Sequence, residues 1–212
     1  MPLVALAGYG AFLVLAIGLR AALHYRDTGT SGIVGVSGRT FSIEWWGGVL
    51  FVVAAVGVGL LAPLAQIAGW VRPWTSDAGP LGYAAGAACT ALGIVGTLRA
   101  QLAMGRSWRV GVDPGERTDL VAHGPFRWVR NPIYTWMILA STGLVLLSPN
   151  WLAAAAFATL VVALEIQVRA VEEPYLLSTH GDAYRRYAST TGRFLPGIGR
   201  LAATAHSPSV SR

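Results

Sequence analysis

Apolar residues lie in long, almost uncharged runs along this chain, and polar residues gather between the runs. The first three runs cover residues 3–23, 45–70 and 81–98. An α-helix rises about 1.5 Å per residue, so about 20 apolar residues cross a hydrocarbon core of about 30 Å. The pattern therefore predicts three transmembrane helices. Tryptophans at both ends of the second run are typical of residues at the membrane interface.

The fourth apolar run, residues 133–164, is about twice too long for one buried helix. Ser148, Pro149 and Asn150 interrupt it, and proline and asparagine favour turns. We therefore predict a helical hairpin, and an all-α polytopic membrane protein with about five transmembrane helices. Each half of the hairpin is slightly short for a full crossing. Three arrangements stay open: a tilted pair, a locally thinned bilayer, or a hairpin that turns back near the far surface.

The composition agrees with a membrane protein. Of the 212 residues, 54% are hydrophobic and only 12% are charged, whereas soluble domains carry about 25% charged residues. The single cysteine, Cys89, excludes an intramolecular disulfide and a thiolate metal cluster. A net charge of +6 would suit nucleic-acid binding in a soluble protein. With this hydropathy, we expect membrane lipids and no nucleic acid as partners.

All 16 basic residues are arginines, and their distribution predicts the orientation of the chain. Three lie near the end of the first predicted helix or after it, one after the second, six between the third and the fourth, and six after the fifth. An N-terminus outside the cell puts 15 of them in the cytoplasm, as the positive-inside rule requires. We therefore predict an outside N-terminus and a cytoplasmic C-terminus.

Two cytoplasmic segments are the expected place for chemistry: the connector 99–132 and the tail helix 165–197. Four charged residues of the tail have the α-helical spacing i, i+4, i+7 and i+8, which predicts one shared face: Glu165, Arg169, Glu172 and Glu173. A charge at mid-bilayer costs about 2.5–3.5 kcal/mol, so this cluster should lie at the interface or beside a polar cavity. The alternative is a solvated, self-paired ion cluster. The histidines lack metal-ligand spacing, so no metal is expected.

Three sequence blocks in the C-terminal half resemble those of a known family. Residues 120–134 read LVAHGPFRWVRNPIY and resemble the pattern LV-x-x-G-P-Y/F-R-x-x-R-H/N-P-x-Y. Residues 104–108, MGRSW, match a G-x-S-W element that often precedes that block. The second signature is matched by a glutamate pair and by residues that follow it: Glu172, Glu173, Gly181, Tyr184, Tyr187 and the run RFLP at 193–196. These are the marks of the isoprenylcysteine carboxyl methyltransferase and phospholipid methyltransferase superfamily.

The resemblance covers about residues 99–197 and implies a division of the chain. Residues 1–98 form three transmembrane helices without a family motif. Residues 99–197 form a methyltransferase core of connector, hairpin 133–164 and tail helix. Residues 198–212 are small or polar and are expected to be a flexible tail. The resemblance is to a bacterial-type member, so the expected location is the bacterial cytoplasmic membrane, with the active site facing the cytoplasm.

Two positions depart from the family pattern. The usual histidine of the R-H-P element is Asn131 here. Asparagine donates and accepts hydrogen bonds but does not titrate near neutral pH, so a mechanism with an imidazole base at this position is not expected. Thr190, Thr191 and Gly192 replace the basic-valine-proline lead that often precedes Arg193, which puts the local contacts there in doubt.

The resemblance implies S-adenosylmethionine as the methyl donor. Arg130, or backbone N–H groups near Gly124 and Asn131, would hold its carboxylate. Glu173 is the candidate for the ribose hydroxyls, and Gln101 for the adenine edge. The sulfonium would lie against Trp128 or Tyr134; alternatively these two rings are only interfacial anchors. Two further residues of the same block complete the predicted cofactor-binding set: His123 and Pro132.

An arginine and a glutamate after the last membrane helix are the substrate-side pair in the family. Arg169 and Glu172 have that place here, so we predict that they are catalytic. The guanidinium would orient a carboxylate in a bidentate manner. Glu172 would hold the arginine in position, or accept a proton from an amine. Since relatives differ by one residue in this spacing, Glu173 could exchange roles with Glu172.

The expected function is an integral-membrane S-adenosylmethionine-dependent methyltransferase acting on a lipophilic acceptor that enters from the bilayer. Its most favoured reaction is O-methylation of an isoprenylcysteine-like carboxylate. Phospholipid amine N-methylation is one alternative. Another is an NADPH-dependent membrane reductase of the sterol type, which has a similar Arg-x-Pro-x-Tyr segment, although the paired glutamates suit the 2′-phosphate of NADPH poorly. A non-enzymatic membrane subunit is disfavoured because it does not explain the motif blocks.

Overall fold

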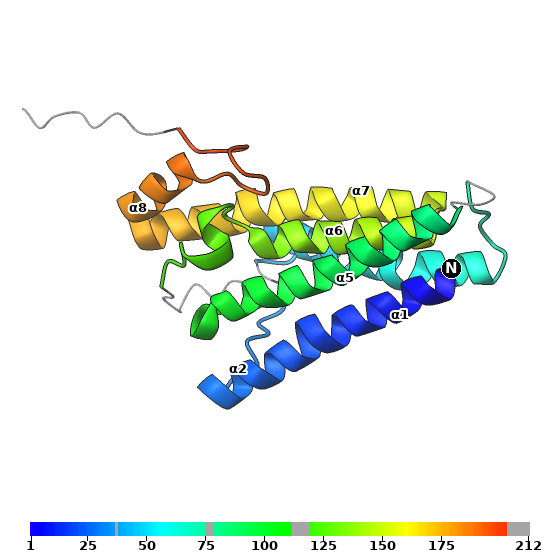
Figure 1. The fold of residues 1–212 in the computed structure, drawn as a ribbon. Coiled ribbons are helices and arrows are strands. Elements are labelled where there is room, and N and C mark those ends of the chain that lie inside the picture. The colour runs from blue at the N-terminus through cyan, green and yellow to red at the C-terminus, as the bar shows by residue number, and fades with distance from the viewer. Residues whose placement is uncertain (37, 75–78, 112–118, 203–212) are drawn as a thin grey trace, which may run out of the picture.

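The computed structural model describes residues 1–36, 38–74, 79–111 and 119–202, and within them the fold is all-α. The described helices combine into five apolar rods, which lie roughly along one direction (Figure 1). Their segments, in chain order, are α1 (Pro2–Phe12), η1 (Leu13–Leu19) and α2 (Arg20–Thr28); α3 (Ile43–Val56), η2 (Gly57–Leu61) and α4 (Ala62–Ile67); α5 (Gly79–Ala103); α6 (Pro132–Leu147); and α7 (Trp151–Ile166), η5 (Gln167–Glu172) and α8 (Glu173–Thr190). The segments η1, η2 and η5 are π-helical turns inside longer helices.

Four of these rods are long and apolar enough to cross a membrane: Pro2–Thr28, Ile43–Ile67, Gly79–Ala103 and Trp151–Thr190. The fifth, α6, has only 16 residues. The predicted all-helical membrane fold is therefore confirmed, with the two halves of the predicted hairpin unequal in length. The second half is not limited to residues 151–164, because α7 continues without a break through η5 into α8.

The predicted turn between α6 and α7 is present and is fixed to α4. The Asn150 side chain caps α7 by accepting a hydrogen bond from the Ala153 N–H at 2.9 Å. Its amide nitrogen donates to the side-chain oxygen of Gln66 at 2.8 Å, and the Ser148 hydroxyl donates to the same oxygen at 2.9 Å. Buried polar groups at the end of the bundle are thus satisfied within the protein, as an apolar environment requires.

Small residues let α5 and α6 pack closely, and the two helices lie side by side in Figure 1. A Cβ atom on Gly86 would lie 3.1 Å from the Gly143 carbonyl oxygen, and one on Gly93 would meet the backbone of Ala140. A Cβ atom on Gly143 would in turn meet the backbone of Gly86 and Thr90. Such close backbone approach is typical of helix pairs in membranes.

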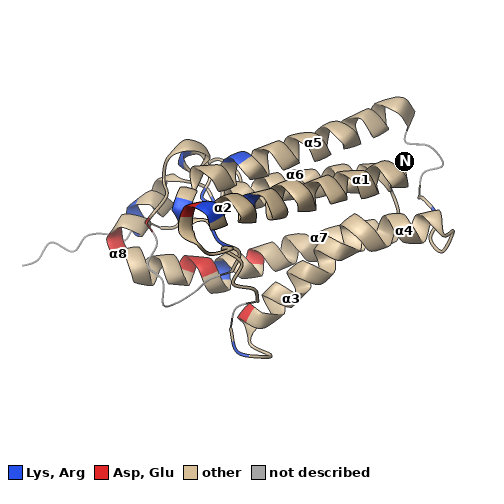
Figure 2. Ribbon diagram, turned by 90° about the horizontal axis from the view of Figure 1, so that it is seen from below, with Lys and Arg blue, Asp and Glu red and all other residues tan. Residues whose placement is uncertain are grey.

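Charged residues gather at the end of the bundle where α2 ends and α8 lies (Figure 2). At this end α8 is bent at Gly181, whose φ of 51° and ψ of −123° are not helical. The chain then returns along the bundle end. The flexible tail was predicted to begin at residue 198, but residues just after this point are bound to the bundle. The Leu201 N–H donates to the Ala188 carbonyl at 3.0 Å, and the Gly199 carbonyl accepts from Arg130. Of that predicted tail, residues 203–212 lie outside the described residues.

Candidate active site

A cavity of about 430 Å³ lies at the charged end of the bundle. Its apolar wall comes from the membrane helices and includes Phe12, Ile17, Phe51, Met137 and Leu164. Its polar wall comes from the end of α5, the connector, the first turn of α6 and the helix that follows α7, and includes Gln101, Arg109, Tyr134, Gln167, Glu172 and Tyr175. Pockets of several hundred Å³ that combine apolar walls with a few polar groups are typical of small-molecule sites.

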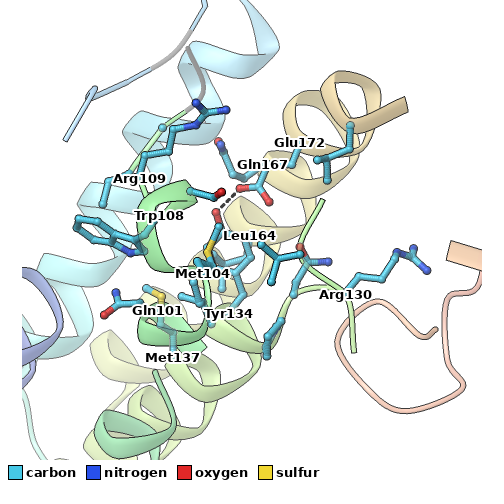
Figure 3. Close-up of a pocket in the computed structure, with 18 of the residues that line it drawn as sticks. Gln101, Met104, Trp108, Arg109, Arg130, Tyr134, Met137, Leu164, Gln167 and Glu172 are labelled. Carbon is cyan, nitrogen blue, oxygen red and sulfur yellow. Dashed lines mark hydrogen bonds between the residues drawn. The ribbon is translucent and has the colours of Figure 1, made fainter. Parts of the chain in front are cut away.

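Tyr134 and Glu172 form the centre of the polar wall. The Tyr134 hydroxyl donates a hydrogen bond to Oε1 of Glu172, from the first turn of α6 to the last residue of η5 (Figure 3). Gln167 lies beside this pair in the same wall. In a π-turn the backbone hydrogen bonds join residues five apart, and Gln167 and Glu172 are separated by that interval. The π-turn therefore directs both side chains toward the cavity.

The same π-turn separates Arg169 from the cavity. Its guanidinium bonds to Glu165, its side chain is 60% exposed, and it is absent from the cavity wall. The predicted contact between Arg169 and Glu172 is not present. The prediction assumed α-helical spacing through residues 165–173, but the wider π-turn over Gln167–Glu172 changes the register between the two side chains.

Arg109 is the cation that sequence analysis did not single out. Its Nη2 donates to the Tyr175 hydroxyl at 3.1 Å, and its guanidinium carbon lies 5.4 Å from the centre of the Tyr175 ring. Figure 3 shows its side chain on the same side of the cavity as Gln167 and Glu172. The only sequence signal was its position directly after Trp108 in the G-x-S-W element.

Arg130 and Glu173 were predicted to bind the donor, but protein groups occupy most of their hydrogen-bonding capacity. Arg130 donates to Glu173 Oε1 at 2.7 Å and to the carbonyls of Ala188, Thr191 and Gly199. In Figure 3 its side chain extends away from Tyr134 and Glu172. Of its nitrogens, only Nε is buried without a partner in the described part of the chain.

Glu173 is enclosed between two arginines. Besides Arg130, Arg193 donates to it from Nε at 2.9 Å and from Nη2 at 3.1 Å. The hydrogen bond to Glu173 is also the main reason that the pKa of Arg193 lies above its ordinary value. The three side chains form a buried ion cluster that ties the connector and α8 to the C-terminal segment.

The other predicted site residues divide into two groups. Gln101, Asn131 and Pro132 lie in the cavity wall, whereas His123, Gly124 and Trp128 are absent from it. Trp128 is 60% exposed, and the Arg127 guanidinium lies 4.5 Å from its ring centre. The geometry therefore matches the alternative reading of Trp128 as a surface anchor more closely than a contact with the sulfonium.

Gln101 is held by helix 1, the first rod Pro2–Thr28. Its Nε2 donates to the Ala16 carbonyl in η1 at 3.0 Å, and this fixes the orientation of the amide. Its Oε1 is buried and has no hydrogen-bond partner among the described residues. A buried acceptor without a partner at the edge of a cavity is suited to a ligand N–H group.

Residues 81–183 match the family model described as Phospholipid methyltransferase. This segment belongs to the phospholipid methyltransferase family. The resemblance predicted from the motif blocks is thereby confirmed, within the isoprenylcysteine and phospholipid methyltransferase superfamily. No curated protein matches the chain in sequence. The match supports a membrane methyltransferase of this family and favours methyl transfer over the reductase alternative.

The phospholipid methyltransferase segment contributes all the polar residues that are named above in the cavity wall. Residues outside this segment complete the cavity: Phe12 and Ile17 come from the first helix, Phe51 comes from α3, and Tyr184 and Tyr187 follow the segment in α8. The site is thus assembled from the family segment together with two helices that carry no family motif.

Proposed function

We propose that the protein transfers a methyl group from S-adenosylmethionine to the carboxylate of an amphiphilic, prenyl-cysteine-like acceptor. The observation that carries the proposal is the joint wall of the cavity. Apolar side chains of membrane helices and the polar group Arg109, Tyr134, Gln167 and Glu172 line one continuous space. Such a space suits an acceptor with a hydrocarbon chain and an ionic head.

The donor fits the polar part of this cavity. The unpartnered Oε1 of Gln101 is suited to an N–H group such as the adenine amine, and the family generally uses this donor. When bound, S-adenosylmethionine supplies an electrophilic methyl group on a sulfonium. Asn131 and Pro132 complete the donor side in this proposal. Because protein acceptors fill the terminal nitrogens of Arg130, only its Nε remains for the donor.

Arg109 takes the role that the sequence assigned to Arg169. A carboxylate acceptor is ionised at neutral pH, so the site must orient and desolvate it rather than deprotonate it. A guanidinium can bind a carboxylate through two parallel hydrogen bonds. Glu172 holds the Tyr134 hydroxyl, and this pair fixes one side of the path between acceptor and donor.

The hydrocarbon chain of the acceptor lies along the apolar wall in this proposal, against Phe12, Ile17 and Phe51. Entry from the bilayer matches an acceptor that is already dissolved in the membrane. The clustering of charge at the site end of the bundle supports a cytoplasmic location for this end, as the arginine distribution predicts (Figure 2).

Phospholipid amine N-methylation is the second candidate. It is supported by Glu172, a carboxylate in the cavity wall, because an ammonium group must lose a proton before it can accept a methyl group. Glu172 would accept that proton in such a reaction.

A radiolabelled methyl-transfer assay tests the proposal. Purified full-length protein in lipid nanodiscs receives labelled donor and either a farnesyl-cysteine carboxylate or phosphatidylethanolamine. We expect the label to be transferred to the farnesyl-cysteine as a methyl ester. Treatment with base should then release the label as methanol, since esters hydrolyse and methylamines do not. Base-stable label on the phospholipid would instead identify the reaction as N-methylation of a phospholipid amine. No label on either acceptor, or on a total membrane lipid extract, would reject methyl transfer to lipids.

A further inference from the structure

Arg20 is a charged residue at the start of the last third of an apolar rod. It begins α2 within the 27-residue helix Pro2–Thr28, yet it is only 2% exposed. An arginine at such a position is costly to bury and usually has a function with an identifiable partner. Helix 1 lies outside the family segment, so the family match assigns no role to Arg20.

The partners of Arg20 are both in the connector. Nη2 donates to the Gly105 carbonyl at 2.6 Å, and the guanidinium carbon lies 4.5 Å from the centre of the Trp108 ring. No ion pair of Arg20 is found among the described residues. A guanidinium over a tryptophan ring is attracted by the negative face of the ring, and the attraction is stronger where water is excluded. The arginine therefore binds a backbone oxygen and an aromatic ring of one short turn, Gly105–Ser107 and the residue after it.

Trp108 is also enclosed from two other directions. His24, one turn after Arg20, packs against its ring with 5.6 Å between the ring centres. A Cβ atom on Gly32 would lie 2.9 Å from this ring, and the Gly32 carbonyl accepts from the Val110 N–H at 2.7 Å. The connector at 105–110 is thus held by helix 1 and by the loop that follows it.

Arg109 lies in the sequence between the two residues that these contacts hold, and its side chain points toward α8. The anchored residues, Trp108 and Val110, are its immediate neighbours, and its own side chain reaches Tyr175 in α8. Fixing the backbone on both sides of Arg109 limits the directions that its guanidinium can take. Arg20 is absent from the cavity wall, which contains Trp108 and Arg109.

We infer that Arg20 is a positioning residue for methyl transfer: through Gly105 and Trp108 it holds Arg109 in the orientation that the acceptor head group requires. The kinetic part of this inference rests on the proposed function. A displacement of about 1 Å at a reacting group can lower a rate about 100-fold. A first helix without family motifs would thereby contribute to the chemistry of the family segment.

The experiment compares Arg20→Gln and Arg20→Lys with a matched control, Arg26→Gln, in the full-length protein in nanodiscs. Arg26 lies on the same helix, is 75% exposed and pairs only with neighbouring Asp27 among the described residues. The first measurement is hydrogen exchange of the peptide that covers residues 104–111. We expect faster exchange in Arg20→Gln at an unchanged melting temperature, with Arg26→Gln identical to the wild type.

The second measurement is methyl transfer with separate kcat and KM values. We expect Arg20→Gln to lower kcat/KM for the acceptor by about 10- to 100-fold, with the KM of the donor unchanged, and Arg20→Lys to recover part of the loss. Wild-type exchange at 104–111 in Arg20→Gln would overturn the inference. If Arg20→Gln does not fold, the exchange at residues 104–111 is measured in Arg20→Lys instead, and wild-type exchange there would likewise overturn the inference. Since exchange needs no turnover, an inactive wild type would reject only the proposed function.

Discussion

The Tyr134 hydroxyl donates a hydrogen bond to the Glu172 carboxylate and so joins the two signature blocks of the chain in one wall of the cavity. Tyr134 belongs to the block that begins α6, and Glu172 ends the π-turn of the last rod. Residues 38 positions apart are thereby brought into one wall. The motif blocks thus contribute to a single site, as a shared reaction requires.

Removing either member of this pair should impair turnover by similar amounts. We expect Glu172→Gln and Tyr134→Phe each to lower kcat/KM by about 10- to 100-fold, because an unsupported partner no longer holds its orientation. The double variant should lose little more than each single variant, since the pair acts as a unit. Asp182→Asn is the control, because Asp182 forms an exposed ion pair with Arg185 and lies outside the cavity wall. Fully additive losses would contradict a shared role.

Arg109 and Arg169 offer a direct comparison between two assignments of the orienting cation. We expect Arg109→Gln to raise the KM of a carboxylate acceptor and lower kcat by at least about 10-fold, because the head group loses its bidentate partner. Arg169→Gln should stay within about twofold of the wild type, as its side chain is outside the cavity wall. The opposite result would return the role to Arg169.

The buried ion cluster should act on stability. Glu173→Gln leaves Arg130 and Arg193 without their shared carboxylate, and breaking a buried pair costs about 3–5 kcal/mol. We expect a clear drop in the melting temperature in detergent. Asp182→Asn is the matched control, because the exposed pair Arg185–Asp182 contributes about 0–1 kcal/mol. Equal melting temperatures for the two variants would exclude a stabilising role for the cluster.

The contact between α5 and α6 should not tolerate a side chain at Gly143. A Cβ atom there would meet the backbone of Gly86 and Thr90, so Gly143→Val must force the helices apart. We expect a lower melting temperature and a reduced yield of folded protein. Gly10→Val is the control, since a Cβ atom on Gly10 would meet nothing within 4 Å. A melting temperature of Gly143→Val equal to that of this control would refute the close contact.

The apolar wall should set the length of the acceptor chain. Phe51→Trp adds volume to this wall, so we expect a larger loss of kcat/KM for a geranylgeranyl acceptor than for a geranyl one. Leu60→Trp is the matched control, because Leu60 is exposed and lies outside the cavity wall. An equal effect of Phe51→Trp on both chain lengths would place the hydrocarbon chain elsewhere.

The sequence predicted the helices and the family because both depend on local pattern. Long apolar runs form helices in a bilayer, where every backbone polar group must be paired within the segment. Residues 133–164 show where a local pattern stops being informative. Ser148, Pro149 and Asn150 identified the turn, but the attachment of the turn to Gln66 could not be predicted, since that contact joins segments about 80 residues apart.

The site itself was only partly accessible to sequence. Gln101, Arg130, Asn131, Pro132, Tyr134 and Glu172 were predicted and lie in the cavity wall, whereas Glu173 does not; their roles stay predictions. Arg130 and Glu173 carry the same motif signal, but they bond mainly to each other and to other protein groups. A family motif indicates that a residue is required in the protein. It does not show whether the residue contacts a ligand or forms an ion pair that stabilises the cavity wall.

The sequence by itself determined an all-helical membrane chain with charge at one end and a methyltransferase segment, because hydropathy and motif spacing are properties of neighbouring residues. Only the tertiary structure decided which cation faces the cavity. The π-turn Gln167–Glu172 accompanies an Arg169 that lies outside the cavity wall, while Arg109 lies in that wall and reaches Tyr175 from the connector. Helical register and long-range contact arise from packing, which the order of residues does not reveal.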